Sequence, residues 1–205
     1  TKSSSLTPTR PAEALVNVKA GNYGKDYNIM INGSNVANKT TPSGSNAADS
    51  PQISTDYIAD GLESQLSMSG YSHTQYGSTI YISKTSGDFT ISTEDGFNGG
   101  GMVAIKGKLQ KFSDLPANPG PAADGFVVEI TGTGSGETAT APFDSYYVKF
   151  DKNSSGGQGV WIECPKPGIN KSFDASTMPF ILVREADGSF TFKQATWTER
   201  IVGDD

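Results

Sequence analysis

The chain has 205 residues, only 35% of them apolar, and its 22 acidic residues outnumber its 16 basic residues to give a net charge of −6. This negative charge excludes a clamp on nucleic acid phosphates, although a conduit through which DNA slides without sticking would carry the same sign. No apolar run approaches the roughly 20 residues of a membrane-spanning helix. The 24 glycines and 11 prolines favour many short strands over a helical bundle.

The first forty residues predict a flexible start followed by strands. Residues 1–14 are rich in Ser, Thr and Pro and are expected to form a flexible N-terminal segment. Apolar residues at 15–18 and at alternate positions of 27–31 predict a hairpin around the turn Gly21-Asn-Tyr-Gly24. Asn32-Gly33 then predicts a tight turn into a third short strand at 34–37.

One helix is expected near residues 55–68, after a loop at 40–51. Thr55 is a suitable N-cap, and Asp56 places a negative charge in the first turn. The helix would show an apolar stripe at four-residue spacing, formed by Ile58, Leu62 and Leu66. Gly61 costs about 1 kcal/mol relative to alanine, so the helix needs this stripe to pack on a sheet.

The rest of the chain predicts further antiparallel strands. Segments 79–83 and 89–92 are expected to form a hairpin, and 102–105 is either strand or irregular. The stretch 112–121 is expected to join the two halves of the chain, and 166–174 is expected to be loop. The clearest strands are the three of a meander, at 126–130, 146–150 and 160–163, and the two of a final hairpin, at 180–184 and 190–193.

These elements predict an α+β fold that is mainly β, with antiparallel hairpins, a three-strand meander and one amphipathic helix packed on a sheet. We expect two small lobes, a first sheet lobe at 15–110 and a second antiparallel sheet lobe at 111–205. Thr1 is not an initiator methionine and the chain stops at Asp205 without a tapering tail. We therefore expect an internal fragment of a longer polypeptide.

Two residue types required for nucleophilic catalysis occur once each. Cys164 excludes an internal disulfide and is expected to be a reduced, partly buried thiol at a strand end. His73 lies in a polar stretch that we expect to be a solvated loop between helix and strand. No G-x-S-x-G motif is present. The sequence therefore predicts no catalytic residues.

Neither the glycine-rich nor the acidic loops form a convincing cofactor or metal site. Gly132-Thr-Gly-Ser-Gly-Glu-Thr138 lacks the lysine of a P-loop, and Gly99-Gly-Gly-Met-Val-Ala104 does not open a helix as a dinucleotide fingerprint would. Asp151-Lys-Asn-Ser-Ser-Gly156 imitates the start of an EF-hand, but its twelfth position is Ile162 instead of glutamate. Glu94-Asp95 beside Gly96 is ambiguous in the same way. We predict no cofactor-binding and no metal-binding residues.

A role in glycan recognition remains open from composition. Paired carboxylates for glycoside hydrolysis require a spatial separation of about 5–10 Å, which the sequence does not supply. Exposed aromatic residues would form a sugar platform, but the alternation of the aromatic residues favours burial in the core. The residues concerned are Tyr146, Tyr147, Trp161 and Trp197.

Several strings from residue 16 onward together resemble the tail tubular protein B family, the tail nozzle of T7-like short-tailed phages. The strings are Val16-Asn-Val-Lys-Ala-Gly-Asn-Tyr-Gly24, Ile31-Asn-Gly33, Lys111-Phe-Ser-Asp-Leu-Pro116, Tyr146-Tyr-Val-Lys-Phe-Asp151, Val160-Trp-Ile-Glu163, Met178-Pro-Phe180, Leu182-Val-Arg184, Ala186-Asp-Gly188 and Val202-Gly-Asp-Asp205. Their order and spacing are similar over nearly the whole chain, and residues 40–69 depart most.

This resemblance implies a structural virion protein, part of a nozzle subunit of the DNA-ejection tube, and no enzyme. It implies copies of the chain in a hexameric tail ring, tail adaptor and tail fibre proteins as partners, and DNA only as passing cargo. It also implies a place in the phage tail, assembled in the host cytoplasm. The alternative, motivated by aromatic and acidic residues, is a carbohydrate-binding or glycan-hydrolysing phage tail domain, and a calcium-stabilised adhesion module is a second one.

Overall fold

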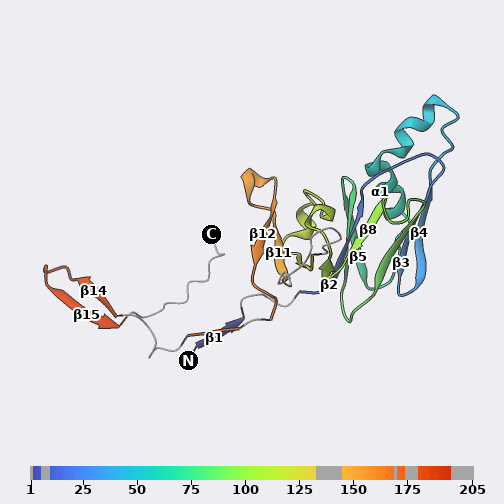
Figure 1. Cartoon of the computed structure of the whole chain (residues 1–205). Helices are drawn as coiled ribbons and strands as arrows, with labels where there is room; N and C mark the ends of the chain where they lie inside the picture. Colours follow the sequence, from blue (N-terminus) through green and yellow to red (C-terminus); the bar gives the residue numbers. More distant parts are fainter. Residues whose placement is uncertain (1, 6–9, 133–144, 169, 174–179, 195–205) are drawn as a thin grey trace, which may run out of the picture. The chain divides into compact units, whose positions relative to one another are not determined.

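The computed structural model describes residues 2–5, 10–132, 145–168, 170–173 and 180–194, which are mainly β, as the sequence predicts (Figure 1). The chain divides into two compact units, Thr9–Lys166 and a smaller one of Thr1–Pro8 with Pro167–Asp205. The strands of the larger unit are β2 (Ala12–Val18), β3 (Asp26–Ile31), β4 (Ser34–Thr40), β5 (Tyr71–Tyr76), β6 (Thr79–Lys84), β7 (Ile91–Asp95), β8 (Met102–Ile105), β9 (Lys108–Leu109), β10 (Val127–Ile130), β11 (Tyr146–Asp151) and β12 (Val160–Cys164). Its helices are α1 (Thr55–Glu63) and the 3-10 turns η1 (Ala47–Ile53), η2 (Phe112–Asp114), η3 (Pro121–Ala123) and η4 (Ser155–Gly157).

Strand β2 is the centre of the larger unit. It lies between β6 and β8 in a sheet of order β5-β6-β2-β8, antiparallel to both neighbours. Ala14, Leu15 and Val16 are consecutive and fully buried, so both faces of this strand are covered. Because successive side chains point to opposite faces, β2 contributes to two separate hydrophobic clusters.

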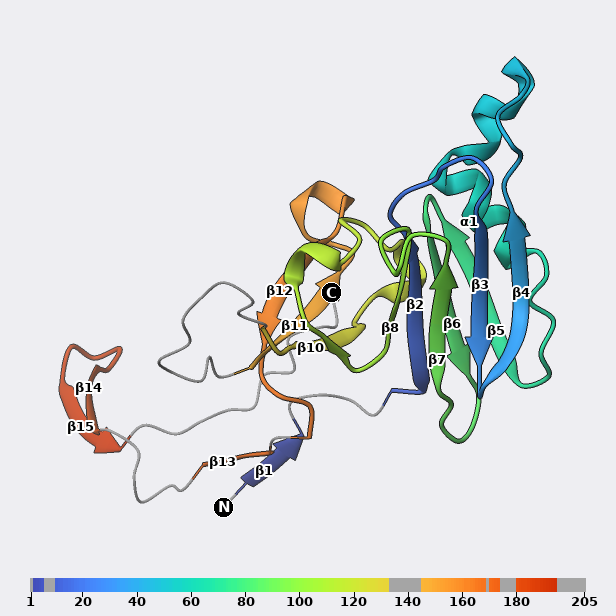
Figure 2. The same cartoon turned by 45° about the vertical axis from the view of Figure 1, so that its right-hand side comes forward.

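The first cluster lies between the β2 sheet and a sheet of order β4-β3-β7 (Figure 2). Val16 and Ile80 from one sheet pack with Tyr27 and Ile29 from the other, all fully buried. The turn between β3 and β4 has Asn32 at φ 50° and Gly33 at φ 79°, which confirms the predicted Asn-Gly turn.

Helix α1 contacts strands of both sheets through Ile58 and Leu62, which are fully buried. The predicted helix is confirmed, but it begins one residue after Ser54 at the N-cap position, and the Thr55 hydroxyl lies 2.5 Å from that of Ser78. It ends at Glu63, before Leu66, which is still buried. Gly61 leaves room for Lys39, whose Cδ would lie 2.9 Å from an added Cβ.

The second cluster lies on the other face of the β2 sheet, against a sheet of order β12-β11-β10-β9. Leu15 and Ile105 pack here with Phe126, Val128 and Phe150. Strands β10, β11 and β12 are consecutive antiparallel neighbours, so the three-strand meander is confirmed. Strand β9 adds to β10 in parallel.

The smaller unit contains two two-stranded sheets. Strand β1 (Lys2–Ser5) pairs with β13 (Asn170–Phe173), and β14 (Phe180–Arg184) pairs with β15 (Phe190–Gln194). The final hairpin is therefore confirmed. The expectation of loop at 166–174 is wrong at β13. This polar segment has no strand-like pattern of its own, but its backbone pairs with the distant strand β1.

Two predicted hairpins are wrong in their pairing although their strands exist. Strand β2 does not pair with β3, since residues 19–25 carry the chain from one sheet to the other. Strand β6 pairs with β5 and β2, and β7 pairs with β3. Residues 71–76, expected to be a polar connection, form β5, and residues 102–105, left open between strand and irregular structure, form β8.

The two clusters divide the larger unit near residue 105, while β2 belongs to both. Strand β2 also begins at Ala12, inside the stretch expected to be flexible. The lobes 15–110 and 111–205 stay a prediction.

Candidate assembly surface

The hairpin β14–β15 is built by a short turn with a sequence suited to it. Gly188 has φ 87°, and its N–H donates to the carbonyl of Glu185 at 3.0 Å. The Asp187 carboxylate accepts hydrogen bonds from the hydroxyl of Ser189 at 2.6 Å and from its backbone N–H at 2.9 Å, and these bonds lower the pKa of Asp187. An Asx-type turn of this kind holds the two strands in register.

One face of this hairpin is a cluster of exposed apolar side chains. The register places Leu182 opposite Phe192 and Arg184 opposite Phe190, so alternate residues of both strands share the face. The rings of Phe180 and Phe192 stack with centroids 5.3 Å apart and planes at 17°. The exposed fractions are 60% for Phe180, 64% for Leu182, 62% for Phe190 and 69% for Phe192. We call these four residues the apolar face.

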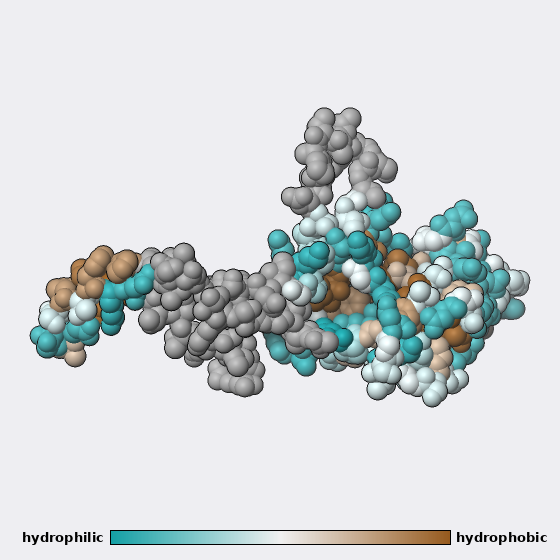
Figure 3. Space-filling view, turned by 90° about the horizontal axis from the view of Figure 1, so that it is seen from below, coloured by the Kyte–Doolittle hydropathy of each residue, from teal (hydrophilic) through white to brown (hydrophobic). Residues whose placement is uncertain are grey.

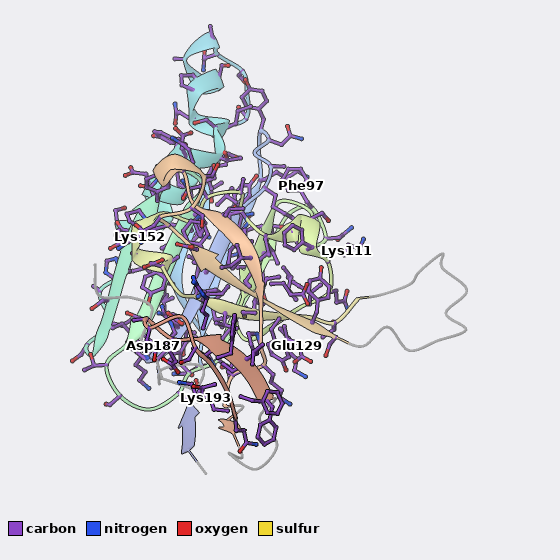
Figure 4. The ribbon with its side chains drawn as sticks, turned by 90° about the vertical axis from the view of Figure 1, so that its left-hand side faces the viewer. Phe97, Lys111, Glu129, Lys152, Asp187 and Lys193 are labelled. Carbon is purple, nitrogen blue, oxygen red and sulfur yellow. The ribbon has the colours of Figure 1, made fainter. Side chains whose placement is uncertain are left out.

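Figure 3 shows brown, hydrophobic atoms gathered on this hairpin beside teal, hydrophilic ones. The opposite face carries Lys193, whose Nζ lies 3.7 Å from Glu185 Oε1, and Figure 4 labels Lys193 together with Asp187. An exposed ion pair of this kind adds little stability. The face that carries Lys193 also carries Ile181, Val183 and Thr191, so both faces of the hairpin are largely apolar and the aromatic one is the more exposed.

His73 lies on β5 and not in a loop, which corrects the sequence-based expectation. Its Nδ1 is 2.8 Å from Glu63 Oε1 of helix α1, and both side chains are 25% exposed. This contact ties the end of the helix to the sheet. Residues 70–76 were expected to be a loop because their polar side chains alternate with few apolar ones, whereas β5 is an edge strand with one solvated face.

Cys164 lies at the end of β12 and is partly buried, as expected for a structural thiol. Burial raises the pKa of this thiol. A raised pKa keeps the thiol protonated near neutral pH and makes it a poor nucleophile.

In the loop that imitates the start of an EF-hand, the first carboxylate, Asp151, accepts hydrogen bonds from residues of the same loop. Asp151 accepts hydrogen bonds from the Ser154 hydroxyl at 2.6 Å and the Asn153 N–H at 3.0 Å, which lower the pKa of Asp151. No group of three His, Cys, Asp or Glu side chains suited to a metal ion occurs within the described residues.

Asp95 organises the glycine-rich loop that follows it. Its two oxygens accept four backbone N–H groups, from Phe97, Gly99, Gly101 and Met102, at 2.7–2.9 Å. Burial alone would raise the pKa of Asp95, but these hydrogen bonds outweigh burial and lower it. The loop 96–101 is thus closed by its own carboxylate, and β8 follows it in place of a nucleotide-binding helix. Of the other glycine-rich loop, residues 133–138 lie outside the described residues.

A linked cluster of ionisable residues at the start of β2 is structural. Glu13 on β2 accepts hydrogen bonds from the Arg10 guanidinium at 2.6 and 2.8 Å and from the Tyr81 hydroxyl at 2.8 Å. Burial and the bond to Glu13 raise the pKa of Tyr81 to about 12. The cluster anchors the start of β2 to β6.

A comparison of the sequence with protein families places these elements in a known context. The chain matches the family described as "Bacteriophage nozzle protein" over residues 1–205. The chain belongs to the bacteriophage nozzle protein family. This confirms the resemblance drawn from the sequence strings.

This nozzle-family chain is also similar to the tail tubular protein gp12 of Escherichia phage T7. The two are 31% identical over 209 residues, which cover 100% of this chain and 25% of the phage T7 protein. The chain therefore spans about a quarter of the length of that relative. In the described residues of the nozzle chain, no helix reaches the length and apolarity that a membrane span requires.

The aromatic residues expected in the core of this nozzle chain divide between core and surface. Trp161 packs on the second cluster, and its Nε1–H donates to the carbonyl of Pro116 at 2.7 Å. Tyr147 is partly buried, whereas Tyr146 is 40% exposed, so core burial is wrong for Tyr146. Trp197 lies outside the described residues.

Sequence reasoning found the β14–β15 hairpin of the nozzle chain but not its exposure. The pattern predicts strands at 180–184 and 190–193 joined by the turn Glu185-Ala-Asp-Gly188. Within the described residues, the apolar face of this hairpin is open. For a chain of the nozzle family, an exposed apolar face is a candidate contact surface rather than a reaction centre.

Proposed function

We propose that this chain is a structural part of the phage tail nozzle, forming part of the wall of the tube through which DNA is ejected. The observation that carries the proposal is the match to the nozzle family over residues 1–205. The phage T7 relative is named a tail tubular protein, which is consistent with a wall component.

The mechanism is passive and depends on shape. In the larger unit three sheets stack with β2 buried on both faces, an arrangement that resists deformation because close-packed interiors are rigid. The net charge of −6 repels DNA phosphates, so DNA passes as cargo without binding. The three-layer body of the larger unit supplies stiffness, and the exposed β14–β15 hairpin of the smaller unit supplies contact surface.

The partners we propose are further copies of the chain in a hexameric tail ring, the tail adaptor and the tail fibre proteins, with assembly in the host cytoplasm. A ring requires the same contact to repeat around a rotation axis. A fold held without an internal disulfide suits assembly in a reducing compartment, and the single Cys164 makes such a bond impossible.

Immunogold labelling of intact phage particles with antibodies against this chain tests the proposal. We expect gold at the tail, and particles deprived of the chain should package DNA but fail to eject it. Gold elsewhere on the particle, or normal ejection without the chain, would contradict the assignment.

We also propose that the chain is not an enzyme. Incubation with capsular and cell-wall polysaccharides should release no reducing sugar above the level of buffer. Release of sugar that one carboxylate substitution abolishes would overturn this part of the proposal and establish the glycan-hydrolysing alternative.

A further inference from the structure

We propose that Asn98-Gly99 is a site of spontaneous deamidation and that the Asp95 carboxylate sets its rate by holding the Gly99 N–H. Asparagine is followed by glycine at one other place in the chain, Asn32-Gly33. There the fold protects the asparagine side chain itself. The inference concerns a covalent modification of the chain and stands independently of the proposed function.

Deamidation is an attack of the backbone on the asparagine side chain. The backbone nitrogen of the following residue loses its proton to hydroxide and forms a bond to the asparagine Cγ, and the side-chain nitrogen takes a proton from water and leaves as ammonia. Water then opens the cyclic imide at either carbonyl, which gives aspartate or isoaspartate. Glycine favours the reaction, because it has no side chain to block the approach and adopts the widest range of backbone angles.

The two Asn-Gly pairs have nearly the same backbone conformation. Asn32 has φ 50° and Asn98 has φ 55°, and the glycines that follow them have φ 79° and φ 83°. All four residues are exposed. Backbone conformation and exposure therefore do not separate the two pairs, whereas the hydrogen bonds around them do.

At Asn32-Gly33 the side chain that would be attacked is held at both of its polar atoms. Asn32 Oδ1 accepts the backbone N–H of Thr90 at 3.0 Å, and Asn32 Nδ2 donates to the Tyr71 hydroxyl at 3.4 Å. The Asn32 backbone N–H also donates to the Thr90 carbonyl at 3.0 Å. The Asn32 Cγ cannot turn toward the Gly33 nitrogen unless these bonds break.

At Asn98-Gly99 the attacking nitrogen is held and the side chain is not. The Asn98 side chain makes no hydrogen bond to another described residue. The Gly99 N–H donates to Asp95 Oδ1 at 2.8 Å. This carboxylate opposes loss of the Gly99 proton, because the nitrogen anion would then lie beside a negative charge. Reaction at Asn98 therefore requires the bond between Gly99 and Asp95 to open.

The loop that holds Gly99 opens more readily than the strands that hold Asn32. Four of the six residues 96–101 are glycines, and the bond from Gly99 to Asp95 is exposed. The Asn32 turn instead joins β3 to β4, and β3 also pairs with β7. Local opening needs least free energy where backbone hydrogen bonds are exposed and buried contacts are few. We therefore expect Asn98 to react first.

Incubation of the whole 205-residue chain in mildly alkaline buffer tests this order without any substitution. Samples are digested at acidic pH, where deamidation is slow, and mass spectrometry measures aspartate and isoaspartate at each position. A parallel incubation in guanidinium chloride gives the rate of each pair in the unfolded chain. Relative to this unfolded rate, the native rate at Asn98 should be at least about tenfold higher than that at Asn32.

Asp95→Ala tests the role of the carboxylate. It releases the Gly99 N–H, so deamidation at Asn98 should become at least about threefold faster while the rate at Asn32 stays the same. Alanine is chosen because asparagine at this position would create a further Asn-Gly pair with Gly96. If circular dichroism shows that Asp95→Ala unfolds, the two rates in the unmodified chain still decide the inference.

The matched control is Asp187→Ala. It removes a carboxylate that accepts the backbone N–H of Ser189 in the smaller unit. This control should deamidate at Asn98 and at Asn32 as the unmodified chain does.

Three results would overturn the inference. A native rate at Asn32 equal to or above that at Asn98 would show that the hydrogen bonds do not order the two sites. An unreacted Asn98 after the unfolded chain has reacted completely would show that the loop does not open. An unchanged or slower reaction at Asn98 in Asp95→Ala would show that the carboxylate does not restrain Gly99.

Discussion

Leu15 is the residue whose substitution most directly tests the three-layer arrangement. It is fully buried on β2, opposite Tyr81 of β6 and Ile105 of β8, and it faces the second cluster. Leu15→Ala leaves a cavity between the sheet that contains β2 and the β12-β11-β10-β9 sheet that packs on it. Such substitutions at fully buried leucines cost about 3–5 kcal/mol.

This loss is a large part of the about 5–15 kcal/mol by which a domain is stable. For a unit of this size, each kcal/mol lowers Tm by about 2–4 °C, so we expect Tm to fall by about 6–20 °C. Urea unfolding followed by tryptophan fluorescence measures the loss of free energy of unfolding, because Trp161 packs on the same cluster. A thermal melt measures the fall in Tm.

Leu182→Ala is the matched control, since it makes the same chemical change at a side chain that is 64% exposed on β14. We expect it to change the free energy of unfolding by less than about 0.5 kcal/mol. Equal effects of the two substitutions, or a loss below about 1 kcal/mol for Leu15→Ala, would refute the burial of β2 on both faces.

Three further predictions follow from individual residues. Asp95→Asn should lower the urea midpoint at neutral pH, because four backbone N–H groups lose the carboxylate that accepts their hydrogen bonds. The folded-state pKa of Asp95 is lowered, so its carboxylate stabilises the fold at pH values above the ordinary Asp pKa of about 3.9. This stabilisation is lost as the pH falls below that value. The difference in urea midpoint between Asp95→Asn and the unmodified chain should therefore become smaller in acid. A difference that does not change with pH would contradict this explanation. Gly157→Ala should lower the free energy of unfolding by about 1 kcal/mol, because Gly157 has φ 87° with open space around it. Gly159→Ala should cost about 1–3 kcal/mol more, because its Cβ would meet the Phe150 ring. Equal decreases in Tm for the two variants would refute the close approach of Gly159 to Phe150. The melting curve should be identical with EDTA and with excess calcium, because Asp151 is bound by its own loop, and a Tm that rises with calcium would instead establish the calcium-stabilised adhesion module.

The hairpin β14–β15 and the meander β10–β12 were predictable because their partners are neighbours in the sequence. Glu185-Ala-Asp-Gly188 encodes its own turn, and this turn sets the register of the two strands that flank it. The same local logic gave the Asn32-Gly33 turn. It failed at β2 and β3, since the segment between them resembles a turn but passes from one sheet to another.

The sequence by itself determined the class of fold, most strands, the helix position and the family. Those features depend on short-range spacing and on strings of residues that resemble those of the family. Only the tertiary structure decided that β2 is a central strand, that His73 lies on β5 against Glu63, and that the apolar face is exposed. A pattern of side chains specifies which face of a strand is apolar, whereas the strand or surface that covers this face is chosen by contacts between residues far apart in the chain.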